Sequence, residues 1–303
     1  MTRSYRIYDV FTERRLEGNP LAVVFDSDGL SDQAMQSVAR EFNLSETVFV
    51  RTPENPLHSA SLRIFTPARE LPFAGHPTVG AAIAIAERAG AVPAVGMVSV
   101  LEEQVGPVRC AVRLSSGGAS FAEFDLPRRS VQLGGGPPRE GLADALGIKS
   151  TEIGFENHLP SLWSAGVPFL LVPVHDVGVA ERIEFDPQLW EKVAPFAEGH
   201  LASAYIYCRG GIYHAARFHA RMFTTDMGIS EDPATGSAAA ALSGAIHRFD
   251  ALPDGHHSTL IEQGVEMGRP SYIHLHIDAA QGKVENARIG GHAVCIAEGQ
   301  LHL

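Results

Sequence analysis

Short apolar runs with a two-residue alternation recur along the chain and predict strands. In the first third they are "YRIYDVF" from Tyr5, "LAVVF" from Leu21, "ETVFVR" from Glu46 and "SLRIFT" from Ser61. The longer stretch "VSVLEEQVGPVRCAVRL", from Val98, predicts two more strands joined by a turn. The chain is therefore expected to be rich in short strands.

Helices are predicted between these strands. "SDQAMQSVAREF" begins on Ser31 as a candidate N-cap, and "DPQLWEKVAPF" begins on Asp186 with Pro187 at the first helical position. Two other segments lack a polar face. "VGAAIAIAERAGA" has no charge before Glu87, and "SAAAALSGAIHRF" has none before Arg248 if its histidine is neutral. A helix that is apolar on all sides is buried on all sides.

The chain contains an internal repeat. "LRIFTPARELPFAGHPTVGAAIAIA" aligns without a gap with "ARMFTTDMGISEDPATGSAAAALSG" at an offset of 158 residues, as from Arg63 to Arg221. At the same offset "SETVFVR" meets "SAYIYCR", and further upstream "GNPLAVVF" resembles "GVPFLLVP". This similarity favours two domains that arose by duplication, with chance likeness of two strand–helix units as the alternative.

The repeat predicts an α+β fold of two pseudo-symmetric domains, residues 1–127 and 128–303. Each domain is expected to be a curved, mainly antiparallel sheet or barrel around a central helix. A cleft is expected between the domains. The prediction includes the option that the last strand packs back on the N-terminal domain. The Gly- and Pro-rich segment Pro127–Gly141 is the predicted linker.

Composition narrows the class of partner. The formal net charge is −11, and the sequence has no Lys/Arg cluster that would follow a phosphate backbone, so nucleic acid is not expected. No apolar run approaches the roughly 18 residues of a membrane span, and "MTRSYRIYDVF" lacks a signal-peptide core, so the expected location is the cytoplasm. Cys110, Cys208 and Cys295 are predicted to be buried thiols, and no metal site is predicted.

Both repeats lead a loop into the start of the apolar helix, at "AGHPTVG" and "PATGSAA". Free backbone N–H groups and the helix dipole favour an anion there, which predicts a small carboxylated substrate. The structural alternative is that Thr78 and Ser237 cap the helices. His76 lies in the first loop, and Glu231 and Asp232 precede the second helix.

Glu46, in "NLSETVFV", has Ala204 as its partner at the offset of 158. Because the scaffold needs no carboxylate there in the second copy, Glu46 is a candidate for proton transfer with His76 or Asp232. The alternative is a solvated strand end, or a capping-type contact after Ser45. Partial burial in a cleft would raise the pKa of Glu46 towards a useful range.

Four motifs, "GNPLAVV", "NLSETVFV", "ELPFAGHPTVGAA" and "GISEDPATGSAAAAL", resemble in order and spacing the PhzF family of phenazine-biosynthesis-type isomerases, which has the diaminopimelate epimerase-like fold. The likeness runs from Tyr5 to the closing "ARIGGHAVCIAEGQL". It implies an active site between two pseudo-symmetric domains, a homodimer and no cofactor.

The resemblance also implies roles for individual residues. It makes Glu46 the proton-transferring acid/base, with His76 and Asp232 orienting the substrate or assisting proton transfer. The implied substrate contacts, at positions that match the same motifs, are Ser45, Gly75, Gly236 and Ser237.

The better-known racemases of this fold use a cysteine at each helix start, and neither "AGHPT" nor "PATGS" has one. The predicted reaction is therefore a cofactor-independent isomerisation or epimerisation by a carboxylate proton shuttle. Two alternatives stay open: an enzyme of different chemistry on the same scaffold, such as a racemase or hydratase, and a non-catalytic carboxylate-binding protein.

Overall fold

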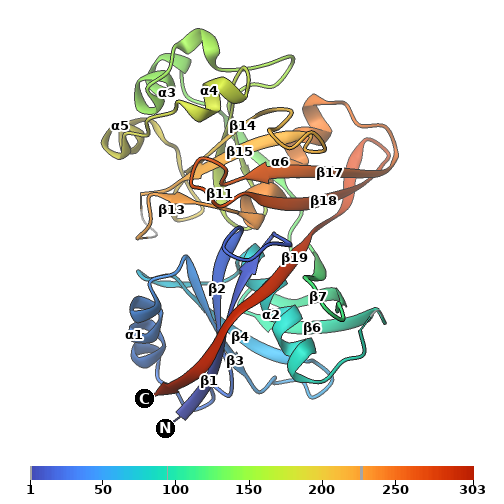
Figure 1. Ribbon diagram of the computed structural model, residues 1–303. Coiled ribbons are helices and arrows are strands. Elements are labelled where there is room, and N and C mark those ends of the chain that lie inside the picture. Colours follow the sequence, from blue (N-terminus) through green and yellow to red (C-terminus); the bar gives the residue numbers. More distant parts are fainter. Residues whose placement is uncertain (1, 94, 226–227) are drawn as a thin grey trace. The chain divides into compact units, whose positions relative to one another are not determined.

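The computed structural model describes residues 2–93, 95–225 and 228–303, which form two compact α+β units (Figure 1). The N-terminal unit contains residues 2–127, Gly228 and residues 290–303, and the C-terminal unit contains residues 128–225 and 229–289. The last strand, β19 (Lys283–His302), begins in the C-terminal unit and ends in the N-terminal unit, where it pairs with β1 (Thr2–Val10). Within the described residues, no helix is long and apolar enough to cross a membrane.

The N-terminal unit is a closed barrel of eight strands around one helix. Its ring runs β1, β2, β3, β4, β6, β7, β8 and the end of β19, which returns to β1. The elements are β2 (Asn19–Val24), α1 (Asp32–Phe42), β3 (Glu46–Arg51), β4 (Ala60–Phe65), β5 (Glu70–Leu71), α2 (Gly75–Arg88), β6 (Met97–Glu103), β7 (Gly106–Arg113) and β8 (Ser120–Asp125). The strands expected from the alternating runs are confirmed.

The C-terminal unit repeats the same order of pairings. β11/β14 and β15/β17 are parallel, as β2/β3 and β4/β6 are, and antiparallel pairs flank them in both units. Its strands are β9 (Val131–Gly135), β10 (Ser161–Ser164), β11 (Pro168–Pro173), β12 (Phe196–Ala197), β13 (His200–Leu201), β14 (Ser203–Arg209), β15 (Phe218–Phe223), β16 (Glu231–Asp232), β17 (Gly255–Gln263) and β18 (Ser271–Ala280). Its helices are α3 (Arg139–Leu146), η1 (Ser150–Glu152), α4 (Val177–Glu181), α5 (Pro187–Val193) and α6 (Gly236–Phe249). This shared topology confirms the predicted pseudo-symmetry.

The two apolar helices are buried, as predicted. α2 is buried almost continuously from Gly75 to Ala86, and α6 from Ala238 to Ile246. Small residues let the surrounding strands approach closely. A Cβ atom on Gly80 would lie 2.5 Å from Leu21 Cδ2, so the barrel wall needs a glycine at that turn of α2.

The gapless alignment of the repeats holds for β4 and β15 but is wrong for the central helices. β4 and β15 begin 158 residues apart, whereas α2 and α6 begin 161 residues apart, at Gly75 and Gly236. Three extra residues therefore precede the second helix. The structural counterpart of His76 is Ser237, where the gapless alignment gave Ala234.

The counterpart of Glu46 also moves by one residue. The parallel ladders place Glu46 opposite Leu21 and Ser203 opposite Phe169, which are themselves equivalent in the repeat. The second copy therefore has Ser203 at this position, where the alignment gave Ala204. The second copy still has no carboxylate at the position of Glu46, because neither Ser203 nor Ala204 is acidic.

Two local predictions have different outcomes. Ser31 and Asp186 are N-caps that accept hydrogen bonds from the first turns of α1 and α5, as expected. The predicted linker Pro127–Gly141 is correct only at its start, where the two units divide between Pro127 and Arg128, because the rest contains β9 and the start of α3. Gly135 lies at the end of β9 and pairs with Ser161 of β10. Gly-rich composition alone therefore did not identify a linker here.

Candidate active site

The start of α2 and the parallel strands β2 and β3 bring three polar side chains together. His76 Nε2 lies 3.3 Å from Glu46 Oε2, and both side chains are almost fully buried. On the other side of the ring, Asn19 Nδ2 lies 3.1 Å from His76 Nδ1. The structure therefore joins the predicted pair Glu46 and His76, and adds Asn19, which the sequence analysis did not select.

This arrangement defines the state of the imidazole. Burial lowers the pKa of His76 to about 3, so the ring is neutral at neutral pH. Because the Asn19 amide donates to Nδ1, the single ring proton lies on Nε2, which faces Glu46. A neutral ring adds no positive charge beside the Glu46 carboxylate.

The residues next to this pair are also buried. Ser45 directly precedes Glu46 at the start of β3, and Gly75 directly precedes His76 as the first residue of α2. The structure therefore places the predicted substrate contacts Ser45 and Gly75 beside the candidate acid/base.

Neither central helix has a side-chain N-cap. The cap positions are Ala74 and Thr235, and neither side chain bonds to the first turn in the described structure. The alternative that Thr78 and Ser237 cap the helices is wrong, because Thr78 is the fourth helical residue and Ser237 the second. With no cap, the first-turn N–H groups and the helix dipole remain suited to an anion. In α6 these first-turn groups belong to Gly236 and Ser237.

Asp232 is held just before α6 by a buried hydrogen-bond network. Thr235 Oγ1 donates to Asp232 Oδ2 at 2.6 Å, and Gln263 Nε2 lies 3.0 Å from Thr235 Oγ1 and 2.8 Å from Asp232 O. Gln263 Oε1 accepts from Thr235 N at 3.2 Å. The counterpart of Asp232 in the first repeat is Leu71, so this carboxylate, like Glu46, occurs in one copy.

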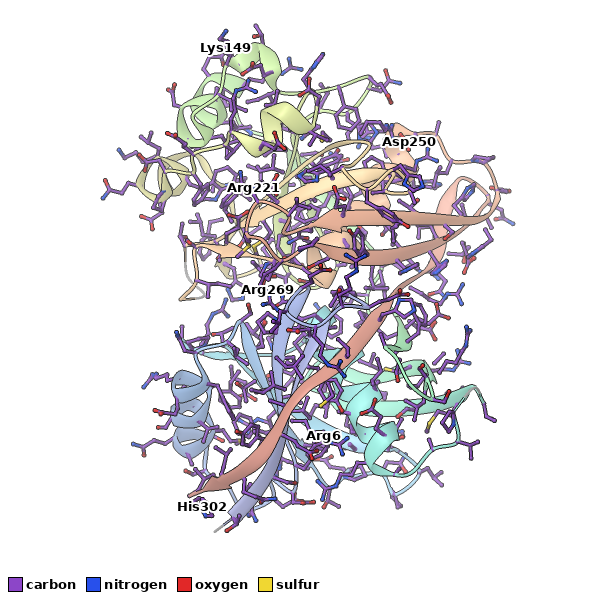
Figure 2. All side chains as sticks on the ribbon, in the orientation of Figure 1. Arg6, Lys149, Arg221, Asp250, Arg269 and His302 are labelled. Carbon is purple, nitrogen blue, oxygen red and sulfur yellow. The ribbon has the colours of Figure 1, made fainter. Side chains whose placement is uncertain are left out.

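Glu231 has a structural role. Arg221, labelled in Figure 2, donates Nε to Glu231 Oε1 at 2.8 Å and Nη2 to Oε2 at 3.0 Å. Arg63 and Glu70 form the equivalent two-point pair in the N-terminal unit. Because both copies keep this pair, Glu231 belongs to the shared scaffold and not to the candidate site.

The sequence analysis missed three residues, Asn19, Thr235 and Gln263. Only Asn19 had a signal in the sequence that could have identified it. Asn19 has the apolar Val167 as its repeat partner, so the criterion that selected Glu46 would also have selected it. Thr235 and Gln263 gave no such signal. Their importance comes from hydrogen bonds between β17 and the loop before α6.

The described residues include one cluster of metal-type ligands, and none of its members is a predicted site residue. Glu156, His158 and Asp250 place their ligand atoms within 4.8 Å of one another. Arg209 Nη2 donates to Glu156 Oε2 at 2.7 Å and Nη1 to Asp250 Oδ2 at 3.0 Å. The guanidinium thus supplies the positive charge that these carboxylates need, and we assign the cluster to structure.

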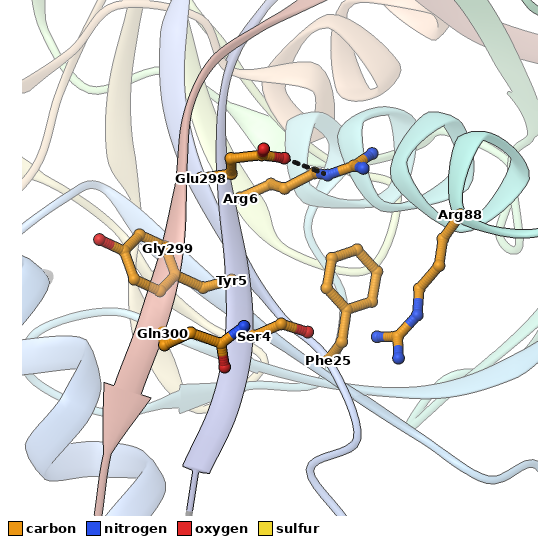
Figure 3. Close-up of a pocket in the computed structure, with 8 residues that line it drawn as sticks. All are labelled: Ser4, Tyr5, Arg6, Phe25, Arg88, Glu298, Gly299 and Gln300. Carbon is orange, nitrogen blue, oxygen red and sulfur yellow. Dashed lines mark ion pairs between the residues drawn. The ribbon is translucent and has the colours of Figure 1, made fainter.

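Figure 3 shows a surface pocket of about 440 Å³ in the N-terminal unit, lined by β1, β19, Phe25 and Arg88. It contains two guanidinium groups that already have carboxylate partners. Arg6 pairs with Glu298 at 3.5 Å, and Arg88 pairs with Asp26 at 2.6 Å. None of the predicted site residues lines this pocket.

The cysteines do not form a thiol pair for proton transfer. Cys110 and Cys208 are buried, as predicted, but Cys295 is only half-buried, which corrects the prediction. Burial raises the pKa of Cys208 to about 12 and that of Cys110 further. Neither buried thiol is ionised at neutral pH.

Known proteins are similar to this chain over nearly its whole length. The sequence model of one family, described as "Phenazine biosynthesis-like protein", matches residues 8–299. A protein named as an uncharacterized isomerase of Mesorhizobium japonicum is 54% identical, over 100% of this chain and 99% of the relative. The trans-2,3-dihydro-3-hydroxyanthranilate isomerase of Pseudomonas aeruginosa is 33% identical, over 99% of both chains.

Among solved structures, the PhzF-family phenazine biosynthesis protein of Bacillus anthracis has the same fold. Its TM-score is 0.87 at 24% sequence identity, and the match covers 100% of both chains.

Proposed function

Because this chain belongs to the phenazine biosynthesis-like (PhzF) family and is an isomerase, we propose that it moves a proton within a small carboxylated metabolite without a cofactor. We assign the proton transfer to Glu46. The observation that supports this most strongly is the buried contact of Glu46 with a neutral His76 whose tautomer is set by Asn19.

The proposed reaction has two proton transfers. The Glu46 carboxylate removes a proton from a substrate carbon next to a carboxylate or a conjugated diene, and the electron pair of the broken C–H bond delocalises into that group. The protonated Glu46 then returns the proton to a different carbon on the same face of the substrate, whereas inversion of the same carbon needs a second acid on the opposite face. No electron leaves the substrate, so the reaction is an isomerisation or epimerisation.

The remaining residues bind and orient the substrate in this proposal. His76, whose Nε2 lies 3.3 Å from Glu46 Oε2, orients the substrate or assists the proton transfer. Ser45 and Gly75 contact the substrate beside Glu46, while Gly236 and Ser237 offer the first turn of α6 to an anionic group. Asp232, fixed by its own network, orients the substrate. That both helix starts serve one substrate remains a prediction from the sequence.

The compound named for the relatives, trans-2,3-dihydro-3-hydroxyanthranilate, is the first test substrate, because it combines a carboxylate with a dihydro ring. The enzyme is incubated with it in deuterated water, and deuterium in substrate and product is followed by mass spectrometry and NMR. We expect deuterium at one or more carbons. Carboxylated metabolites that raise the melting temperature are tested in the same way.

The outcomes separate the competing functions. Deuterium with a shifted double bond or an inverted centre supports the proposal, whereas gain or loss of water indicates a hydratase-type enzyme. Binding of a carboxylated compound with no exchange at any carbon would contradict proton transfer and support a carboxylate-binding protein.

A further inference from the structure

A second buried carboxyl group lies beneath the first turn of α2. Glu103 is the last residue of β6, and its side chain points into the barrel, 8% exposed. Its Oε1 lies 2.8 Å from the hydroxyl oxygen of Thr78. The same hydroxyl lies 2.7 Å from the carbonyl oxygen of Ala74. Glu103 therefore connects the barrel wall to the helix turn that contains His76.

The hydrogens available to these three groups define the protonation of Glu103. Thr78 has one hydroxyl hydrogen, and the Ala74 carbonyl can only accept. When Thr78 donates to Ala74, as a helical threonine commonly does, the hydrogen between Thr78 and Glu103 comes from the carboxyl group. Glu103 then has to be a neutral carboxylic acid.

The second repeat supports this assignment independently. Gln263 ends β17 as Glu103 ends β6, and each side chain reaches the polar residues at the start of the central helix. Gln263 donates Nε2 to Thr235 Oγ1 at 3.0 Å. A glutamine amide has the shape of a protonated glutamate and carries a donor at every pH. The second repeat thus has a neutral donor at this position.

The surroundings of Glu103 also favour the neutral form. On the neighbouring strand β4 the buried side chains are apolar, namely Ala60, Leu62, Ile64 and Phe65. β7 contributes the buried thiol of Cys110, and α2 contributes His76, which is neutral. Among the described residues, no cation acts on Glu103, and burial raises the pKa of this carboxyl group to about 8 against the opposing effect of the Thr78 hydrogen bond.

We propose that Glu103 is a positioning residue that keeps its proton in the folded enzyme, donates it to Thr78 and thereby holds the first turn of α2 in place. Loss of this proton removes the donor and puts an anion beneath the helix start where Gly75 and His76 lie. A substrate anion then binds less well at that turn. This last step rests on the proposed function, whereas the protonation of Glu103 does not.

The first test measures the proton directly and needs no substrate. Infrared difference spectra between the wild type and Glu103→Gln are recorded at pH 6 and pH 10. We expect the C=O band of a carboxylic acid at pH 6 and its replacement by carboxylate bands at pH 10. Carboxylate bands at pH 6 would overturn the proposal.

Thermal unfolding gives a second readout. Between the ordinary pKa of 4.5 and about 8, folded Glu103 holds a proton that the unfolded chain has lost, so this group's contribution to stability falls as pH rises through that window. The melting temperature of the wild type is therefore expected to fall more steeply from pH 5 to pH 9 than that of Glu103→Gln. Gln263→Glu is the matched control in the second repeat and should steepen the fall. Equal slopes for the wild type and Glu103→Gln would contradict the proposal.

The third test measures how KM depends on pH. At pH 9 about one tenth of Glu103 keeps its proton if its pKa is about 8, so KM for the test substrate should rise about tenfold from pH 7. This rise should be absent in Glu103→Gln. If the enzyme turns over no carboxylated substrate, the proposed function fails, while the infrared and unfolding results still decide the role of Glu103.

Discussion

His76 is a buried histidine whose two ring nitrogens face different partners, the Asn19 amide and the Glu46 carboxylate. Its pKa of about 3 lies below the ordinary 6.5, so between these values the unfolded chain binds a proton that folded His76 does not. This group therefore reduces stability as pH falls through that window. We expect ¹⁵N NMR to show a neutral His76 ring with its proton on Nε2 from pH 8 down to pH 5. Protonation of both nitrogens near pH 6 would contradict this prediction.

Asn19 is predicted to act through His76. Asn19→Val introduces the residue type found at the equivalent position of the second repeat and removes the donor to Nδ1. Loss of one buried hydrogen bond is worth about 1–3 kcal/mol, so the rate of deuterium exchange should fall roughly 10- to 100-fold. Circular dichroism checks that the variant is folded. An exchange rate equal to that of the wild type would show that Asn19 has no role in the reaction.

At the residue scale, the sequence identified groups that occur in only one repeat. Glu46 was found in this way and from the family motifs, Asp232 was found from its place before the second helix and from the motifs, and the structure shows both to be buried. The contacts of Asn19 and Gln263 could not be predicted, because they depend on which residues of separate strands and helices become neighbours. The role of Glu231 was open for the same reason.

At the scale of elements, Gly264 supports the loop that holds Asp232. It has φ +77°, and a Cβ atom there would lie 2.5 Å from Pro233 O and 2.6 Å from Arg269 O. Gly264→Ala should destabilise the protein by about 3 kcal/mol or more, because backbone strain and a backbone clash add. Gly282→Ala is the matched control, since Gly282 has φ +70° and nothing within 4 Å of such a Cβ.

Urea unfolding measures both glycine variants. The control should lose about 1 kcal/mol, which is the cost of the left-handed conformation alone. If Gly264→Ala lost no more than Gly282→Ala, the close approach of the backbone at Gly264 would have no energetic effect.

Elements with a clear hydrophobic period were predictable, and loops were not. The alternating runs gave the strands of the N-terminal barrel, and the uncharged segments gave α2 and α6. The three-residue insertion before α6 escaped the gapless alignment because loop length leaves no periodic signal. The Gly- and Pro-rich segment Pro127–Gly141 was read as a linker, although pairing with β10 makes part of it a strand.

At the scale of the whole molecule, the chain is a two-unit α+β isomerase of the PhzF family. Glu46 belongs to the N-terminal unit and Asp232 to the C-terminal unit. If they serve one reaction, their effects should not add. We predict that Glu46→Gln combined with Asp232→Asn lowers the exchange rate by little more than Glu46→Gln alone. Fully additive losses of activation free energy would indicate that the two residues act independently.

In the proposed reaction Glu46 carries the proton. The most direct test compares the wild type, Glu46→Gln and the control Glu191→Gln, an exposed glutamate on α5, in deuterated water with one substrate. We predict that Glu46→Gln lowers deuterium incorporation about 10²- to 10⁴-fold while substrate binding persists, and that Glu191→Gln matches the wild type. Wild-type deuterium incorporation by Glu46→Gln would contradict the account.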